Sequence, residues 1–376
     1  MKTSQYPFHV IIKPVGDSCN LKCGYCFYQC KSLDDDKVMS ESVLEEVIRQ
    51  YITQQPMGCR EVQFVWQGGE PMLAGLEFYQ KAIELQHKYA RPGMHITNAM
   101  QTNGTLLNRR WAEFLKQHDF LVGISIDGDK QNHDQQRLYF SGKPSFDNVM
   151  RGLRYLMELE VRFNVLSVVH NDNVHLARQT YEFLLSKGVK SIQYLPDTLN
   201  HIDANAWGRF LIETFQSWLK DGVGQVTVQL FDATFTRVHT NFETFCVHAK
   251  QCGHQLAVER GGEVYSCDHF VEPEYRLGRI GDSDFVSMME SEPHRKFATN
   301  SVTSHDDCMS CCVRGVCQGG CPRHRDIGDK NQLCDGYKQF FRYSAPYFLA
   351  MSECLRRRLP PTQYKQFLPL TKLSFV

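Results

Sequence analysis

Three cysteines near the start of the chain have the spacing of a cluster-binding loop. Cys19, Cys23 and Cys26 lie in the stretch CNLKCGYC, a C-x3-C-x2-C arrangement. A [4Fe–4S] cluster normally takes four thiolate ligands, so three cysteines leave one iron open to a ligand that is not protein. The alternative is a zinc loop, but zinc sites usually pair a C-x2-C with a second, distant pair of ligands. The spacing therefore predicts a [4Fe–4S] cluster with one open iron.

A second group of cysteines lies between positions 246 and 354. Eight of them are enough to ligate two further [4Fe–4S] clusters fully, and full ligation leaves electron transfer as their role. Two structural zinc sites are the alternative interpretation. Cys30, Cys59, Cys312 and Cys354 are interpreted as ordinary thiols, although Cys30 lies close to the first loop. The eight candidate ligands are Cys246, Cys252, Cys267, Cys308, Cys311, Cys317, Cys321 and Cys334.

The composition excludes several classes of partner. Lysine plus arginine equals aspartate plus glutamate at 42 each, so the zero net charge gives no electrostatic reason to expect nucleic acid or an anionic membrane. The first residues, MKTSQYPFHV, lack the apolar run of a signal peptide, and no stretch approaches 18 apolar residues. We expect a soluble, cytoplasmic protein, in which fifteen cysteines are metal ligands rather than disulfides.

Six strand-like runs alternate with helical patterns along the first two hundred residues. Crossovers of this length favour a parallel sheet, in which the chemistry lies in loops at the carboxyl ends of the strands. Six units suit an open (β/α)6 partial TIM barrel, although repeat number alone does not exclude a doubly wound sheet. The expected strands are 8–14, 62–66, 96–101, 121–126, 161–169 and 192–195; the expected helices begin after Ser40 and cover 76–89, 111–118, 146–158 and 176–187.

The loop after the second strand carries Gly68, Gly69 and Glu70, followed by proline. Glycines let a backbone approach a ligand closely, and a carboxylate beside them accepts hydrogen bonds from an ammonium group. A GGEP loop one β/α unit after a C-x3-C-x2-C loop resembles the radical S-adenosylmethionine (SAM) enzymes, whose open iron binds the amino and carboxylate groups of SAM. The resemblance implies that this loop grips the SAM amino group.

Further SAM contacts are implied at the ends of the other strands. Arg137 is a candidate partner of the SAM carboxylate, because a guanidinium group suits bidentate carboxylate recognition. A surface arginine is the alternative reading of that residue. The remaining candidate contacts to SAM are Tyr25, Gln101, Asn103, Ser125, Asp127 and Leu195.

A closer resemblance covers roughly residues 8–347. The motifs CNLKCGYCFY, WQGGEPMLAGLEFY, MQTNGTLLN, FLVGISIDGD, HDQQR, GGEVYSCDHFVEPEYRLGRIGD and CQGGCPRHR together resemble the anaerobic sulfatase-maturating enzymes. These enzymes oxidise a cysteine or serine of a sulfatase to Cα-formylglycine without oxygen. The resemblance implies a radical SAM partial barrel over 1–225, a SPASM domain with two auxiliary clusters over 226–350, and a tail over 351–376.

The resemblance also assigns roles to residues of the SPASM domain. Asp268, directly after Cys267, corresponds to the proposed catalytic base of the family; a carboxylate that orients the cluster loop is the alternative reading. An auxiliary cluster beside it would accept the electron of the substrate. The inner cluster is implied at Cys246, Cys252, Cys267 and Cys321, and the outer cluster at Cys308, Cys311, Cys317 and Cys334.

The expected partners are a peptide or protein substrate and an electron donor such as flavodoxin or ferredoxin. Two other functions stay open on the sequence alone. A radical SAM/SPASM enzyme of this kind could instead crosslink a small ribosomally made peptide. A zinc-binding adaptor without catalysis would need four ligands at each site, where the first loop offers three.

Overall fold

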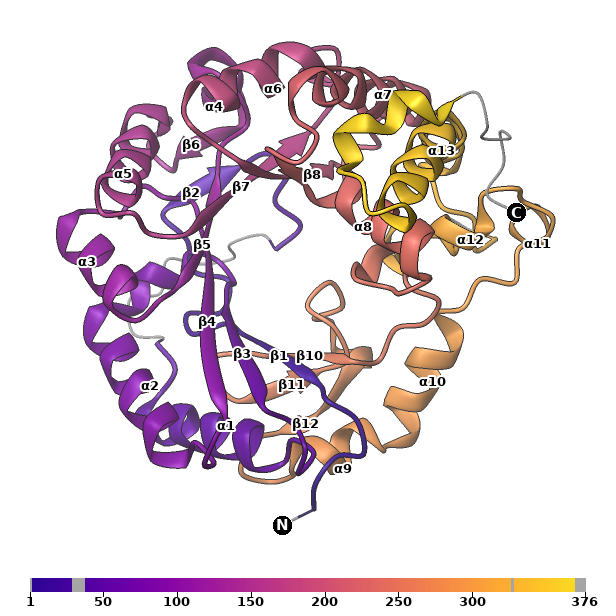
Figure 1. The fold of residues 1–376 in the computed structure, drawn as a ribbon. Helices are drawn as coiled ribbons and strands as arrows, with labels where there is room; N and C mark the ends of the chain where they lie inside the picture. The colour runs from indigo at the N-terminus through magenta and orange to yellow at the C-terminus, as the bar shows by residue number, and fades with distance from the viewer. Residues whose placement is uncertain (1, 29–37, 326–327, 369–376) are drawn as a thin grey trace. The chain divides into compact units, whose positions relative to one another are not determined.

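The structure is a computed structural model that describes residues 2–28, 38–325 and 328–368 (Figure 1). Cys30 lies outside these residues. The chain divides into two units that interleave along the sequence. The first unit comprises Met1–Ser125, His133–Phe163 and Cys252–Asn300, and the second comprises Ile126–Asn132, Asn164–Gln251 and Ser301–Val376. The domain boundaries at 225/226 and 350/351 stay a prediction.

The first unit is built on a largely parallel sheet. Four predicted strands are confirmed as neighbours in the order β1 (His9–Ile12), β3 (Glu61–Trp66), β4 (His95–Thr102) and β5 (Leu121–Ser125). Val62, Phe64 and Trp66 alternate with more exposed residues of β3, because successive side chains of a strand point to opposite faces. In Figure 1, helices α1, α2 and α3 lie along the outer side of these strands.

A later segment extends this sheet on the other side of β1. The strand β10 (Gln255–Val258) pairs with β1 in parallel, with Ile12 opposite Val258. Antiparallel strands β11 (Glu263–Tyr265) and β12 (Arg276–Arg279) follow. The sequence did not predict this pairing, which places the residues after β1 beside those after β10.

The helices of the first unit confirm the predicted periodicity. Ser40 is the N-cap of the first helix, and its side chain accepts a hydrogen bond from the amide of Val43. Apolar residues of that helix, including Leu44, Val47 and Ile48, are buried at the helical spacing of a core face. The helices are α1 (Glu41–Thr53), α2 (Leu76–Tyr89), α3 (Arg109–Gln117), α5 (Phe146–Glu158), α9 (Phe285–Met289) and α10 (Glu292–Asn300), with 3-10 turns η1 (Pro71–Ala74) and η3 (Pro273–Tyr275).

The second unit contains the last two predicted strands and an aromatic helical core. The strands β7 (Phe163–Val169) and β8 (Ser191–Pro196) are parallel, and the short strand β9 (Thr227–Val228) joins β8. Helix α4 (Lys130–Gln136) bridges the two units along the sequence. The other helices are α6 (Ala177–Ser186), α7 (Ala204–Asp221), α8 (Gln229–Thr240), α11 (Asp306–Met309), α12 (Arg314–Cys317) and α13 (Cys334–Arg356), with 3-10 turns η2 (Cys246–His248), η4 (Pro322–His324) and η5 (Pro361–Gln366).

Helices α7 and α13 approach each other closely at two glycines. A Cβ atom on Gly336 would lie 2.1 Å from the carbonyl oxygen of Ala204, and one on Gly208 would lie 2.8 Å from the Cα of Gly336. Both contacts are with backbone, which cannot move without separating the helices. We therefore expect Gly336→Ala to lower the free energy of unfolding by about 1–3 kcal/mol.

Thermal unfolding followed by circular dichroism measures this effect. Gly315→Ala in α12 is the matched control, because its added Cβ would meet no atom within 4 Å. An unchanged melting temperature for Gly336→Ala would show that the helices separate at no cost.

Among the described residues, no helix is long and apolar enough to cross a membrane.

Candidate active site

The cysteine loop and the GGEP loop pack backbone against backbone. The amide of Gly69 donates to the carbonyl of Gly16 at 2.8 Å, and the amide of Glu70 donates to that of Ser18 at 2.8 Å. A Cβ on Gly69 would lie 1.9 Å from the Ser18 oxygen. Gly68 has φ +131°, a conformation that favours glycine. Both glycines are therefore required by the cysteine loop, whatever they contact in a ligand.

Glu70 is fully buried and holds the ends of two elements together. Its Oε1 accepts hydrogen bonds from the amide of Met72 and the hydroxyl of Thr102, and its Oε2 accepts one from the amide of Asn103. Burial raises the pKa of this carboxyl to about 7, against the effect of these hydrogen bonds. The structure thus gives Glu70 a positioning role, and its contact with the SAM amino group stays a prediction.

Asn103 lies beside the first cysteine of the loop. Its Nδ2 donates to the Asn20 side chain at 2.8 Å and lies 3.7 Å from the Cys19 sulfur. Thr105 donates its hydroxyl proton to Asn103 Oδ1 and accepts from Asn20, which closes the network. This network fixes the orientation of Cys19. Asn20 and Thr105 were not predicted, although short polar residues around a glycine turn are typical of such local hydrogen bonds.

A two-stranded sheet brings Arg137 to the cysteine loop. Strand β2 (Leu21–Cys23) pairs with β6 (Arg137–Tyr139), and Cys23 stands opposite Arg137. The guanidinium group is buried, with its central carbon 5.4 Å from the centre of the Tyr25 ring. A buried guanidinium against an aromatic face contradicts the reading of Arg137 as a surface arginine. Its contact with the SAM carboxylate stays a prediction.

The other candidate SAM contacts lie at strand ends in both units. In the first unit, Gln101 donates to the Ser125 hydroxyl at 3.2 Å. In the second unit, Asp127 is fully buried and accepts a hydrogen bond from the amide of Val168 at 2.8 Å. Leu195 pairs with Val168 in the register of β7 and β8. Their roles toward SAM stay predictions.

The thiols of the first loop fit a cluster. Burial raises the pKa of Cys19 to about 12, and the Glu70 carboxylate and the neighbouring Cys23 and Cys26 add to the shift. The half-buried thiol of Cys19 would therefore stay protonated without a cation nearby. Metal binding removes such protons and converts thiols into thiolate ligands.

The four cysteines predicted for the outer cluster also lie together. Burial raises the pKa of Cys317 to about 12, and the charges of Cys334, Cys308 and Cys311 act in the same direction. All four are free thiols in the structure. Cys308 is buried and the other three are half-buried, and their mutual proximity within the second unit fits a fully ligated cluster.

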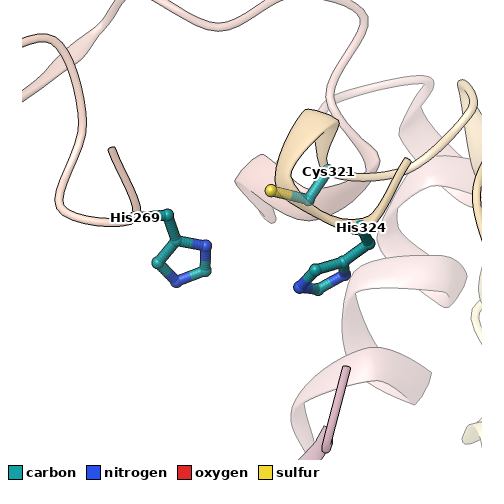
Figure 2. A group of neighbouring side chains, drawn as sticks. All are labelled: His269, Cys321 and His324. Atoms are coloured by element: carbon teal, nitrogen blue, oxygen red, sulfur yellow. The ribbon is translucent and has the colours of Figure 1, made fainter. Parts of the chain in front are cut away.

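The cysteines predicted for the inner cluster are divided between the units. Cys252 and Cys267 lie in the first unit, and Cys246 and Cys321 lie in the second. Figure 2 shows Cys321 at the start of η4 with His324 on the same turn, and the Cys321 sulfur lies within 4.8 Å of a ring nitrogen of His324. The grouping of these four cysteines stays a prediction.

Three of the described cysteines are outside the predicted ligand sets. Cys59 donates to the carbonyl of Glu61 at 3.2 Å, and Cys354 is completely buried in α13. Cys312, next to a predicted ligand, is exposed. Nothing in these surroundings points to metal binding.

Asp268 is held by residues from the start of the chain. Its Oδ2 accepts a hydrogen bond from Gln67 Nε2 at 2.7 Å, and its Oδ1 lies 3.7 Å from the Cys267 sulfur. Its backbone carbonyl lies 3.4 Å from the ammonium group of Lys13. A carboxylate held in this way keeps lone pairs that no hydrogen bond occupies, and it can accept a proton there from a neighbouring group. Neither Gln67 nor Lys13 was predicted, although a lysine directly after a buried strand is an unusual feature.

Comparisons with known proteins found matching family models and similar curated proteins. The family model of the Radical SAM superfamily matches residues 14–184, and that of the SPASM iron-sulfur cluster-binding domain matches residues 246–312. The "Serine-type anaerobic sulfatase-maturating enzyme" of Klebsiella aerogenes is 38% identical over 90% of this chain and 85% of that protein. The "Cysteine-type anaerobic sulfatase-maturating enzyme" of Clostridium perfringens is 32% identical over 93% and 100%.

A solved structure confirms the predicted fold class. Native anSMEcpe with bound AdoMet and Kp18Cys peptide superposes with a TM-score of 0.87 at 32% identity, over 92% of this chain and 99% of that one. The fold is therefore a radical SAM partial (β/α)6 barrel with a C-terminal SPASM domain. The two family models imply the predicted cofactors, [4Fe–4S] clusters and SAM, and make the protein a radical SAM oxidoreductase. On this identity and coverage, the chain belongs to the family of anaerobic sulfatase-maturating enzymes.

Proposed function

We propose that this protein oxidises a cysteine or serine in a sulfatase-type peptide to Cα-formylglycine. The observation that carries the proposal is the placement of Asp268. Its side chain bonds to Gln67, next to the GGEP loop, and it directly follows the candidate cluster ligand Cys267. A proton acceptor therefore lies in the same unit as the cysteine loop at which SAM would be cleaved.

Three [4Fe–4S] clusters and SAM are the proposed cofactors. Their ligands are the three cysteines of the first loop and the two sets of four named for the SPASM domain. When bound, these groups supply the electron that cleaves SAM, the 5′-deoxyadenosyl radical that takes a hydrogen atom from the substrate Cβ, and an acceptor for one substrate electron. Arg137 and Glu70 would bind the two charged ends of the methionine part of SAM.

Asp268 completes the oxidation by removing a proton. After loss of a hydrogen atom from Cβ, the substrate loses one electron and the proton of its thiol or hydroxyl group, and Asp268 takes that proton. This gives an aldehyde from serine or a thioaldehyde from cysteine, and water hydrolyses the thioaldehyde to the aldehyde with release of hydrogen sulfide. Gln67 donates to Oδ2 of Asp268, and Oδ1, which lies 3.7 Å from the Cys267 sulfur, keeps a lone pair that can accept the proton.

A peptide is the proposed substrate, and an external protein such as flavodoxin or ferredoxin the proposed electron donor. The peptide is supported by the solved structure of anSMEcpe, which contains one. The choice of target residue is supported by sequence identity, which is 38% to the serine-type enzyme and 32% to the cysteine-type enzyme. We therefore propose serine as the preferred target.

Two matched peptides test the function and the target together. The protein is reconstituted anaerobically and given SAM, dithionite and a peptide carrying either Ser-x-Pro-Ser-Arg or Cys-x-Pro-Ser-Arg. We expect mass spectrometry to show aldehyde formation from both peptides, faster from the serine peptide. Faster oxidation of the cysteine peptide would contradict the preferred target. Formation of 5′-deoxyadenosine with both peptides unchanged would contradict the sulfatase-type substrate.

A further inference from the structure

Lys13 is a buried lysine at the carboxyl end of β1. Its side chain is 1% exposed, and its stem lies under the GGEP loop, where a Cβ on Gly68 would be 3.2 Å from the Lys13 Cβ. Burying an ammonium group is costly unless negative groups surround it. We therefore expect negative or electron-rich groups around the ammonium of Lys13.

Three groups surround the ammonium of Lys13. The Glu259 carboxylate lies 3.8 Å away, the carbonyl oxygen of Asp268 lies 3.4 Å away, and the centre of the Tyr28 ring lies 3.6 Å away. Tyr28 in turn donates its hydroxyl proton to Glu259. Tyr28 is two residues after Cys26, so these contacts around Lys13 link the first cysteine loop to the Cys267 loop.

Four groups of negative or potentially negative charge act electrostatically on this ammonium. Burial lowers the pKa of Lys13, and the charges of Glu259, Asp268, Cys267 and Cys26 oppose that shift. Asp17 and Arg260 act on the Glu259 carboxylate with opposite signs. Lys13 therefore places a positive charge beside these anionic groups, in contact with the Asp268 carbonyl and near Glu259.

We infer that Lys13 is a positioning residue whose buried positive charge raises the reduction potential of the cluster ligated by Cys267. Accepting an electron makes a thiolate-ligated cluster more negative, and a nearby cation in a medium of low dielectric constant stabilises that state. The electron comes from the substrate radical and the accompanying proton goes to Asp268, so Lys13 acts on the cluster through its charge. The inference rests on the proposed ligand role of Cys267.

Potentiometric titration of the reconstituted protein, followed by electron paramagnetic resonance, tests this inference without substrate. SAM changes only the signal of the cluster with the open iron, which identifies that signal. Lys13→Met keeps the length of the side chain and removes its charge. We expect the reduction potential of the inner cluster to be lower in this variant. An at least tenfold smaller equilibrium constant for its reduction corresponds to a decrease of about 59 mV for one electron.

Three further variants make the test specific. Lys13→Arg keeps the positive charge and should have the same inner-cluster potential as the unmodified protein. Glu259→Gln removes a negative charge and should raise the inner-cluster potential. Lys116→Met, which removes a lysine from the exposed surface, should leave every potential unchanged. The outer cluster serves as an internal reference.

Unchanged inner potentials in Lys13→Met and Glu259→Gln, with full iron content, would overturn the inference. If Lys13→Met does not retain its clusters, Glu259→Gln alone decides, and an unshifted potential there counts against the proposal. A wrong peptide substrate would not affect these measurements. Retention of all clusters in Cys267→Ala would instead contradict the ligand assignment on which the inference rests.

Discussion

Replacing Asp268 by asparagine should abolish aldehyde formation while SAM cleavage continues. Asparagine has the shape of aspartate and still accepts a hydrogen bond from Gln67, but it cannot take up the substrate proton. Loss of a positioned general base typically lowers a rate by about 10²–10⁴-fold. The measurement is the ratio of aldehyde to 5′-deoxyadenosine under anaerobic turnover.

A matched variant and the iron content complete this test. Asp282→Asn removes an exposed carboxylate of the same unit and should leave the ratio unchanged. Iron and sulfide analysis of Asp268→Asn should equal that of the unmodified protein, which excludes loss of the neighbouring cluster. An undiminished aldehyde yield would assign Asp268 to orienting the Cys267 loop and place the base elsewhere.

The second large effect is expected from Gly69→Ala. The added Cβ would lie 1.9 Å from the carbonyl oxygen of Ser18, directly before the first cysteine of the loop. That contact is with backbone, so the loop must move. Because Cys19, Cys23 and Cys26 must face one cluster, we expect loss of the cluster with the open iron and of all SAM cleavage.

The auxiliary clusters distinguish this effect from general unfolding. Their ligands lie elsewhere in the chain, so the variant should retain about two thirds of its iron under full loading, as four-iron clusters imply. Gly58→Ala is the control, since its Cβ would meet no atom within 4 Å. Full iron content with normal 5′-deoxyadenosine formation in Gly69→Ala would show that the loop accommodates the methyl group.

The positions of the main elements could be predicted from local sequence patterns. Six strands and five helices follow from apolar periodicity, because each pattern is satisfied within at most 14 consecutive residues. The cysteine spacing likewise predicts its cluster, since the ligands must face one metal group. The pair of β2 and β6 was missed, because each strand has only three residues and carries no periodic signal.

The surroundings of the reactive residues required the tertiary structure. Glu70 was predicted as a ligand of SAM, but the fold also commits it to Met72 and Asn103. The sequence identified Asp268 without its partners, because those partners are distant: Gln67 lies 201 positions away and Lys13 lies 255 positions away.

The pairing of β1 with β10 explains that difference. The sequence by itself determined the family motifs, the strands and helices, and the cysteines available as ligands. Only the tertiary structure decided that the ends of β1 and β10 lie side by side, with Ile12 opposite Val258. Sheet register is set by long-range packing rather than by local pattern, and here it places Lys13 beside Glu259 and Asp268.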